Sequence, residues 1–201
     1  MQGKRAGGAK RKILEIAVLL FSETGYGNVG LGDIAKAAGI RTGSLYNHFK
    51  SKDDILFQIY QLYENKLAQV LPDMDNLLSL ARATHPHEIL KRAQYYFDPE
   101  DQDLMGRIEI IALTESLNDG MSAQFIERNL TGTVNSIVRP LLTRLIELRR
   151  IEPLDVDAYV KIATNLRYSA AVLSLSKNPL GLSEQVRAND FLNELVKPTG
   201  L

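Results

Sequence analysis

The segment Leu31–Phe49 constrains the fold of this chain more than any other. Apolar side chains recur at intervals of three and four residues through Leu31–Ala38 and stop at Gly39, which predicts a short amphipathic helix that ends there. A second short helix is expected over Thr42–Phe49. Because glycine permits the positive φ angle of a sharp turn, the two helices can cross as a helix-turn-helix.

Helices are also expected on both sides of this segment. Upstream, Ile13, Ala17 and Phe21 share one helical face, and Gly25 stands where a left-handed residue ends a helix. Residues 2–9 are expected to lack regular structure. Downstream, a longer helix is expected from a serine cap at position 51 to about position 71, before a proline.

The rest of the chain is expected to be helical too, since strand alternation with hairpin dipeptides is not evident. Its segments end near prolines, and they are 73–84, 86–97, 101–118, 122–150, 155–177 and 183–197. Pro140 is expected to kink the fourth of them. The sequence therefore predicts an all-α fold, with a three-helix helix-turn-helix domain over 1–55 and a larger C-terminal helical bundle over 56–201.

Charge is distributed unevenly along the chain, although its net value is zero. Residues 1–55 carry nine basic and five acidic side chains, and residues 56–201 carry fifteen basic and nineteen acidic ones. A basic N-terminal segment followed by an acidic remainder favours an anionic partner for the N-terminal segment alone. The sequence has no cysteine, which excludes disulfides and thiolate metal sites. No apolar run approaches the ~18 residues of a membrane span, and residence in the cytoplasm is expected.

The helix expected over Thr42–Phe49 presents a polar face. At about 100° per residue, Phe49 lies on the side of Leu45, while Gly43 and Asn47 lie opposite. If Leu45 points into the core, the exposed residues are Gly43, Ser44, Tyr46 and Asn47. This face suits a DNA major groove, where Asn47 can pair with an adenine edge and Ser44 can donate or accept a hydrogen bond.

Neighbouring side chains suit the phosphate backbone. Tyr46 and His48 can donate to phosphates, and Lys52 can add a contact from the next helix. A solvated polar face on a small core helix explains the same periodicity equally well, so the pattern alone leaves both readings open.

Three stretches resemble the tetracycline-repressor (TetR) family of bacterial transcriptional regulators. They follow one another within Ile13–Leu56 and read LFSETGY (20–26), DIAKAAG (33–39) and GSLYNHFKSK (43–52). The resemblance implies an all-helical homodimer with an N-terminal DNA-binding domain for a palindromic double-stranded operator, and a C-terminal domain for dimerisation and a small-molecule effector. The positions that match the family's DNA contacts are Thr42, Gly43, Ser44, Tyr46, Asn47, His48 and Lys52.

The chain departs from the family pattern just before each of the two helices of the helix-turn-helix. Val29 and Gly30 stand where the family usually has a capping Thr or Ser, so Asn28 or Gly30 is expected to cap instead. Arg41 stands where the family usually has a serine, before the helix expected over Thr42–Phe49. Arginine caps poorly but can read guanine or clamp a phosphate, and Arg41 is added to the DNA-binding set. The basic N-terminal segment Lys4–Lys12 is expected to increase the affinity for DNA.

Apolar side chains in the second domain are candidates for an effector pocket, and ordinary core packing is the competing interpretation. The candidate residues are Tyr63, Tyr95, Met105, Ile108, Met121, Phe125 and, as a polar anchor, Asn165. Glu109 and Glu115 are further polar candidates, but the sequence favours a solvated or capped polar residue at each of these positions and at Asn165. The effector is expected to be a small apolar or amphipathic molecule.

The helices about 155–177 and 183–197 are expected to form the dimer interface, because they offer both small side chains that let helices approach and large apolar side chains that supply buried area. The small residues are Ala163, Ala170, Ala171 and Ser174, and the large ones are Leu166, Leu173, Phe191, Leu192 and Leu195. His85-Pro86-His87-Glu88 lacks a further convincing ligand, so no metal is expected, and no cofactor and no catalysis either. The alternatives to an effector-released repressor are a nucleoid or division factor of the same fold, and an enzyme or lipid carrier with an incidental helix-turn-helix.

Overall fold

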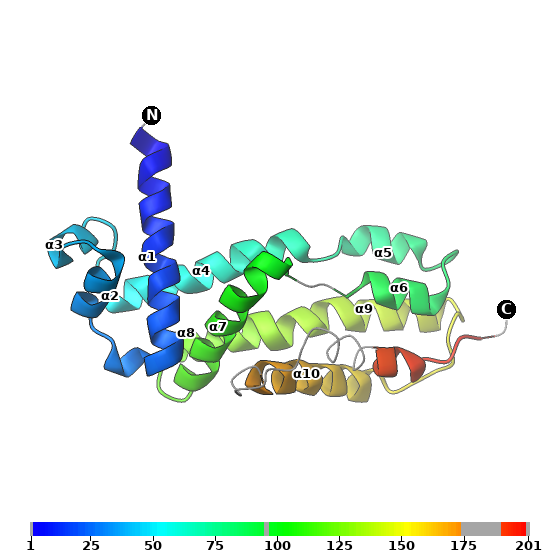
Figure 1. The fold of residues 1–201 in the computed structure, drawn as a ribbon. Helices are drawn as coiled ribbons and strands as arrows, with labels where there is room; N and C mark the ends of the chain where they lie inside the picture. Colours follow the sequence, from blue (N-terminus) through cyan, green and yellow to red (C-terminus); the bar gives the residue numbers. More distant parts are fainter. Residues whose placement is uncertain (1, 95–96, 174–189, 200–201) are drawn as a thin grey trace. The chain divides into compact units, whose positions relative to one another are not determined.

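A computed structural model describes residues 2–94, 97–173 and 190–199 (Figure 1). The described residues form helices joined by turns and irregular loops, with one isolated antiparallel bridge between Ile151 and Pro198. The chain has an all-α fold with an N-terminal helix-turn-helix, as the sequence predicts. It divides into two compact units, Met1–Gln69 with Phe97–Ile126, and Val70–Tyr96 with Glu127–Leu201.

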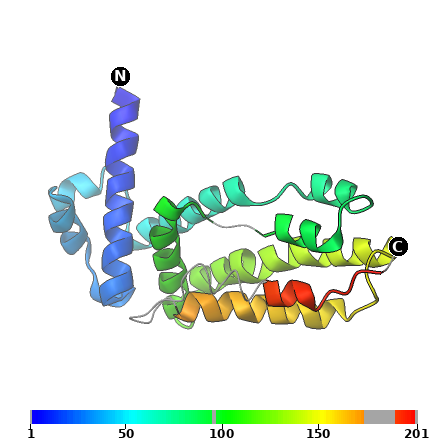
Figure 2. The same cartoon turned by 45° about the vertical axis from the view of Figure 1, so that its right-hand side comes forward.

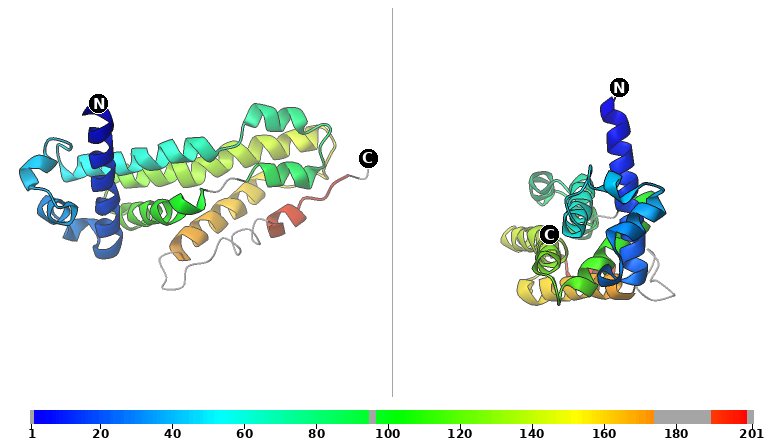
Figure 3. Two further views of the ribbon diagram at one scale, coloured as in Figure 1. Left: turned by 45° about the horizontal axis from the view of Figure 1, so that its top comes forward. Right: turned by 90° about the vertical axis from the view of Figure 1, so that its left-hand side faces the viewer.

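The first compact unit contains the helix-turn-helix and three longer helices. Its elements are α1 (Gln2–Thr24), η1 (Tyr26–Asn28), α2 (Leu31–Ala38), α3 (Thr42–Leu45), α4 (Lys52–Val70, of which the last residue falls in the other unit), α7 (Pro99–Glu115) and α8 (Gly120–Ile126). Helix α1 packs on α2 and on α7, and α7 packs on α8. Helix α1 runs crosswise to α4 (Figure 3).

The expected apolar face of α1 is buried. Ile13, Ala17 and Phe21 are at most 4% exposed, which confirms the helical spacing of this segment. Gly25 follows with a φ of 86°, and the ring of Tyr26 meets that of Phe21 edge to face at 4.9 Å between centroids. The expected lack of structure in residues 2–9 is wrong, because α1 begins at Gln2. No proline interrupts this stretch, and its two alanines, one lysine and one arginine favour a helix, whereas its three glycines disfavour one.

Helix α4 begins and ends where the sequence predicts. The hydroxyl of Ser51 accepts a hydrogen bond from the backbone N–H of Asp54 at 3.0 Å, so serine caps the helix as expected. Tyr60, Tyr63 and Leu67 are all buried on one side of it. The expected domain boundary at residue 55 falls inside this unbroken helix, so the division into 1–55 and 56–201 stays a prediction about function.

The second compact unit is a helical bundle of its own (Figure 2). Its elements are α5 (Met74–Leu80), α6 (Pro86–Arg92), the π-helical turn η2 (Glu127–Gly132), α9 (Thr133–Glu147) and α10 (Val156–Leu173). Helix α5 packs on α6 and α9, and α10 packs along α9. Pro140 lies inside α9, which continues past it to Glu147. The core contains Leu77, Ile89, Leu141 and Leu145, and Leu192 from the C-terminal segment joins it.

Candidate nucleic-acid interface

The turn between α2 and α3 has the geometry that its glycine predicts. Gly39 adopts φ 69° and ψ 29°, a left-handed conformation, and its N–H is directed to the carbonyls of Ala35 and Lys36. Residues with a Cβ rarely adopt this conformation, so Gly39 sets the angle at which α3 leaves α2.

Helix α3 is shorter than the sequence predicts. It spans Thr42–Leu45, and a turn follows at residues 46–48. The N–H groups of His48 and Phe49 both donate to the carbonyl of Leu45, at 2.9 Å and 3.0 Å, so the expected helix continues only as a tightened turn. The expectation of a full helix over Thr42–Phe49 was wrong in this respect. Glycine and asparagine, both poor helix formers, contribute to the early end.

Two side chains anchor this segment in the core. Leu45 is 1% exposed and Phe49 is 2% exposed, which confirms the face that the sequence assigns to the interior. The ammonium group of Lys10, on α1, lies 5.7 Å from the centroid of the Phe49 ring. A cation this close to an aromatic face is attracted by its quadrupole. Helix α1 therefore contacts the segment Thr42–Phe49, which carries the predicted DNA-contacting residues and is called the reader segment below.

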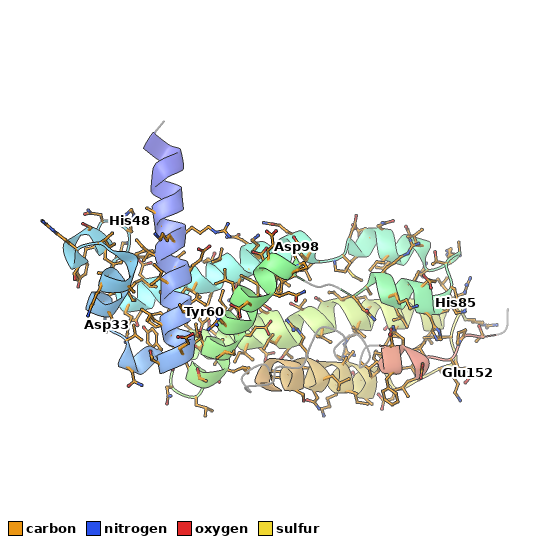
Figure 4. The ribbon with its side chains drawn as sticks, viewed as in Figure 1. Asp33, His48, Tyr60, His85, Asp98 and Glu152 are labelled. Carbon is orange, nitrogen blue, oxygen red and sulfur yellow. The ribbon has the colours of Figure 1, made fainter. Side chains whose placement is uncertain are left out.

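The opposite face is open to solvent. Tyr46 is 57% exposed, Gly43 and Asn47 are exposed, and Ser44 and His48 are half-buried. A Cβ atom added at Gly43 would meet nothing within 4 Å, so this position presents bare backbone to an incoming partner. Figure 4 labels His48 and, on a different edge of the same domain, Asp33. The structure thus brings the predicted reader residues together on one surface.

Arg41 and Thr42 lie at the edge of this surface. Arg41 occupies the position before α3 with an extended backbone, and its side chain makes no capping hydrogen bond. Both side chains are exposed. The guanidinium group of Arg41 is therefore accessible to a base edge or a phosphate, in keeping with its predicted role.

The N-terminus of α2 is closed by Asp33, which is not one of the caps predicted from the sequence. The N–H of Gly30 donates to Oδ2 of Asp33 at 2.8 Å, so the carboxylate returns to the residue that precedes the helix. Of the two expected caps, Gly30 takes the N-cap position. Asn28 donates to the carbonyl of Thr24 and so closes α1. The three-residue spacing from Gly30 to Asp33 resembles that of a capping box and was the available signal.

Lys52, predicted to contact a phosphate, makes contacts within the protein. Its Nζ donates to the carbonyl of Tyr26 at 2.9 Å and to that of Val29 at 3.0 Å. It also lies 4.2 Å from the centroid of the Tyr26 ring. An ammonium group has three donors, so one remains for another partner.

The predicted effector residues are distributed over both compact units. Tyr63, Met105, Ile108 and Phe125 are buried in the first compact unit, and Met121 is half-buried there. Tyr95 lies outside the described residues. Asn165 lies on α10 of the second unit and is exposed.

Aromatic rings surround the buried part of α4. The ring of Tyr63 meets Phe97 and Phe125 edge to face, with centroids 5.2 Å and 4.9 Å away. Its hydroxyl donates to Oε1 of Glu109, on α7, at 2.6 Å. Glu109 is 4% exposed, so its interpretation as a solvated polar residue is wrong, and it is a polar group buried inside the first unit.

A second buried polar contact joins α4 to α8. The hydroxyl of Tyr60, labelled in Figure 4, lies 2.8 Å from that of Ser122, which donates to Asp119 at 2.7 Å. Burial raises the pKa of Tyr60 above its ordinary value, so the phenol stays protonated at neutral pH. Neither Ser122 nor Asp119 is among the residues predicted from the sequence. Their spacing at the start of α8, where Asp119 accepts from the N–H of Ser122, was the local signal.

Helix α7 is also bonded to the end of α1. Nη1 of Arg107 lies 3.1 Å from the hydroxyl of Ser22 and 3.4 Å from Oε1 of Glu23. The helices that hold Met105, Ile108 and Glu109 are therefore packed in one unit with the reader segment.

The histidine pair does not form a metal cluster in the part of the chain that the structure describes. The rings of His85 and His87 meet edge to face at 5.3 Å, and Nε2 of His87 lies 2.8 Å from the carbonyl of Val196. These contacts fasten the start of α6 to the C-terminal segment of the second unit.

The predicted dimer helices are described only in part. Helix α10 covers the first of them to Leu173, and residues 190–194 are helical within the second. Ile162, Phe191 and Leu195 are exposed there, at 44%, 60% and 47%. Within the described ranges, no helix is long and apolar enough to cross a membrane.

A polar, solvent-facing surface on a short helix held by a glycine turn defines the class of domain: it is a helix-turn-helix, the motif that many DNA-binding proteins use. Residues 13–59 match the model of the bacterial regulatory proteins of the tetR family. Residues 13–59 therefore form a domain of the tetR type.

Curated relatives share the N-terminal part of the chain. The regulator AcrR of Shigella flexneri is 41% identical over 61 residues, which are 30% of this chain and 28% of AcrR. The negative regulator of the biofilm operon, IcaR of Staphylococcus aureus, is 34% identical over 89 residues, 44% of each protein. The chain thus matches less than half the length of these relatives.

Solved structures share the whole fold at low identity. The ketosteroid transcriptional regulator of Mycobacterium tuberculosis superposes with a TM-score of 0.67 at 20% identity, over 94% of both chains. A putative regulator from Saccharomonospora viridis, solved in complex with choline, gives 0.64 at 19% identity, over 95% of this chain and 98% of that one. These matches show a common fold.

Proposed function

We propose that this protein is a transcriptional repressor that binds a palindromic double-stranded operator as a homodimer and is released by a small apolar or amphipathic effector. One observation carries the DNA-binding part of the proposal. Gly43, Tyr46 and Asn47 are exposed on a segment whose other side, Leu45 and Phe49, is buried, inside the stretch that matches the tetR family.

The exposed residues divide by chemistry. Asn47, Ser44 and Arg41 carry groups that read base edges, whereas Tyr46 and His48 carry groups that donate to phosphates. Gly43 lets the backbone approach the groove because no side chain intervenes. In a two-fold dimer, two such surfaces engage half-sites about 34–36 Å apart.

To test DNA binding, fragments of the source genome are passed over the immobilised full-length protein. The fragments that the protein retains are then footprinted to locate the protected sites. One or a few protected palindromic sites upstream of genes support the repressor. Protection at many unrelated sites favours a nucleoid or division factor, and no protection at all favours a ligand-binding protein with an incidental helix-turn-helix. A variant with Asn47→Ala and Tyr46→Ala is the matched control, since both side chains are exposed and their loss leaves the core intact.

The effector proposal rests on where the candidate residues lie. Tyr63, Met105 and Phe125 belong to the same compact unit as the reader segment, and α7 is bonded to α1 through Arg107. A ligand that separates α4 from α7 would therefore shift packing that continues to α1. Such coupling is typically ~1–3 kcal/mol, and operator DNA must weaken ligand binding by the same factor.

The effector experiment screens apolar acids, acyl chains and aromatic cations by thermal shift, then titrates each hit with and without operator. Weaker binding in the presence of operator supports release by the ligand. A hit with the same affinity in both titrations contradicts it, even if the ligand binds tightly.

A further inference from the structure

The Lys52 side chain is built into a junction of three elements, the end of α1, the turn η1 and the start of α4. Its ammonium group donates to the carbonyls of Tyr26 and Val29, at 2.9 Å and 3.0 Å. Tyr26 is the first residue of η1, and its carbonyl also accepts a hydrogen bond from the N–H of Val29 at 3.3 Å, the residue that follows η1. The ammonium group therefore bonds both ends of this turn.

Tyr26 holds the other side of the junction. Its ring lies between two partners: Phe21 meets it edge to face at 4.9 Å, and the Lys52 ammonium lies 4.2 Å from its centroid. Its hydroxyl donates to the carboxylate of Asp53, the residue after Lys52. Burial, and then this hydrogen bond, raise the pKa of Tyr26 above its ordinary value, so the phenol remains a donor.

The junction lies next to the two helices of the helix-turn-helix, α2 and α3. Val29 is two residues from the start of α2, and Lys52 is the first residue of α4. The segment before α2 is therefore held to the N-terminus of α4 by several contacts. They are the two hydrogen bonds from the Lys52 ammonium group, its cation–π contact with Tyr26, and the hydrogen bond from Tyr26 to Asp53. A half-buried lysine committed to two carbonyls has one N–H left, and using it on a phosphate would compete with the aromatic contact.

We propose that Lys52 is a positioning residue: together with Tyr26 it sets the orientation of α2 and α3 relative to the start of α4, and it does not act chiefly as a phosphate contact. The inference rests on the proposed DNA binding, and it changes the role that the sequence pattern suggests for this lysine.

The test compares Lys52→Met with Lys50→Met in the full-length protein. Lys50 is exposed, so its replacement removes the same charge without disturbing the junction. Without DNA, Lys52→Met should lower the Tm by about 2–4 °C or more and speed amide exchange across Leu31–Phe49, while Lys50→Met leaves both unchanged. An unchanged Tm and unchanged exchange in Lys52→Met would overturn the proposal.

Operator titrations over a range of salt concentrations give the second readout. Lys52→Met should weaken operator binding by about tenfold and change the salt slope no more than Lys50→Met does. A slope that falls by about 0.9 per protomer beyond the control, at wild-type Tm, shows a direct phosphate contact and overturns the proposal.

Tyr26→Phe keeps every charge and serves as the second variant. It removes only the hydrogen bond to Asp53, and it should weaken operator binding at an unchanged salt slope. Wild-type affinity in this variant contradicts the proposal. If the wild-type protein retains no DNA fragment, the proposed function fails, whereas the Tm and exchange comparison of Lys52→Met with Lys50→Met still decides the positioning role.

Discussion

The hydroxyl of Tyr63 donates to Oε1 of Glu109 over 2.6 Å, and both residues are buried between α4 and α7. Tyr63→Phe removes the donor and leaves a buried carboxyl oxygen with one partner fewer. We expect a loss of about 1–3 kcal/mol in the free energy of unfolding, measured by urea denaturation. The matched variant Tyr60→Phe removes a bond to the hydroxyl of Ser122 and should cost about 0.5–1.5 kcal/mol. A larger loss in Tyr60→Phe than in Tyr63→Phe would contradict this ranking.

The ion pair between Lys66 and Asp101 should stabilise the first unit more than a surface pair does. Its atoms are 2.6 Å apart, and its side chains are only 25% and 13% exposed. Arg11 and Glu15, at 2.8 Å, are 55% and 41% exposed. In double-mutant cycles we expect a coupling above ~1 kcal/mol for the first pair and about 0.3–0.5 kcal/mol for the second. Equal couplings would show that burial does not strengthen the Lys66 pair.

Asp54 should make the stability of the protein depend on acid pH. Hydrogen bonds from the Gln58 side chain and then from the Lys50 backbone N–H lower the pKa of its carboxyl group. Because the folded pKa lies below the unfolded value of about 3.9, the added stability is fully present well above that value and is lost as the pH falls through the folded pKa.

Asp54→Asn is the variant that tests this dependence. It should be less stable than wild type at pH 7, and the difference should shrink as the pH is lowered from about 5. Thermal unfolding at a series of pH values measures it. A difference that stays constant down to the acid transition would mean that Asp54 titrates as it does in the unfolded chain.

Asn47 should determine sequence preference. Asn47→Ala is expected to cost about 1–3 kcal/mol at the operator, because the bidentate hydrogen bonds to adenine can no longer form, and little on random DNA. Competition titrations with both DNAs measure the two changes in affinity. Equal changes would show that Asn47 contacts only the backbone.

The basic start of α1 should act on all DNA sequences alike. Replacing Lys4 and Arg5 by Gln is expected to weaken operator and random DNA equally and to flatten the salt slope by about 0.9 for each phosphate that the protein no longer neutralises. Lys161→Gln, at an exposed lysine of α10, controls for total charge. A full slope in the double variant would rule out this segment as a DNA arm.

Local spacing was enough to predict much of the reader domain. The turn at Gly39, the serine cap of α4 and the burial of Leu45 and Phe49 all depend on residues within a few positions of one another. Helical periodicity and capping are properties of such short stretches, so the sequence alone determined the all-α class and the side of α3 that faces outward.

Other features depend on which distant residues meet. Lys52 bonds a carbonyl 26 residues away, Tyr63 a carboxyl 46 residues away, and Arg107 a hydroxyl 85 residues away. Periodicity states which face of a helix is buried but not which helix covers it, because that choice is made by packing in three dimensions. For this reason the sequence suggested a phosphate partner for Lys52, and only the tertiary structure revealed the junction that takes up its ammonium group.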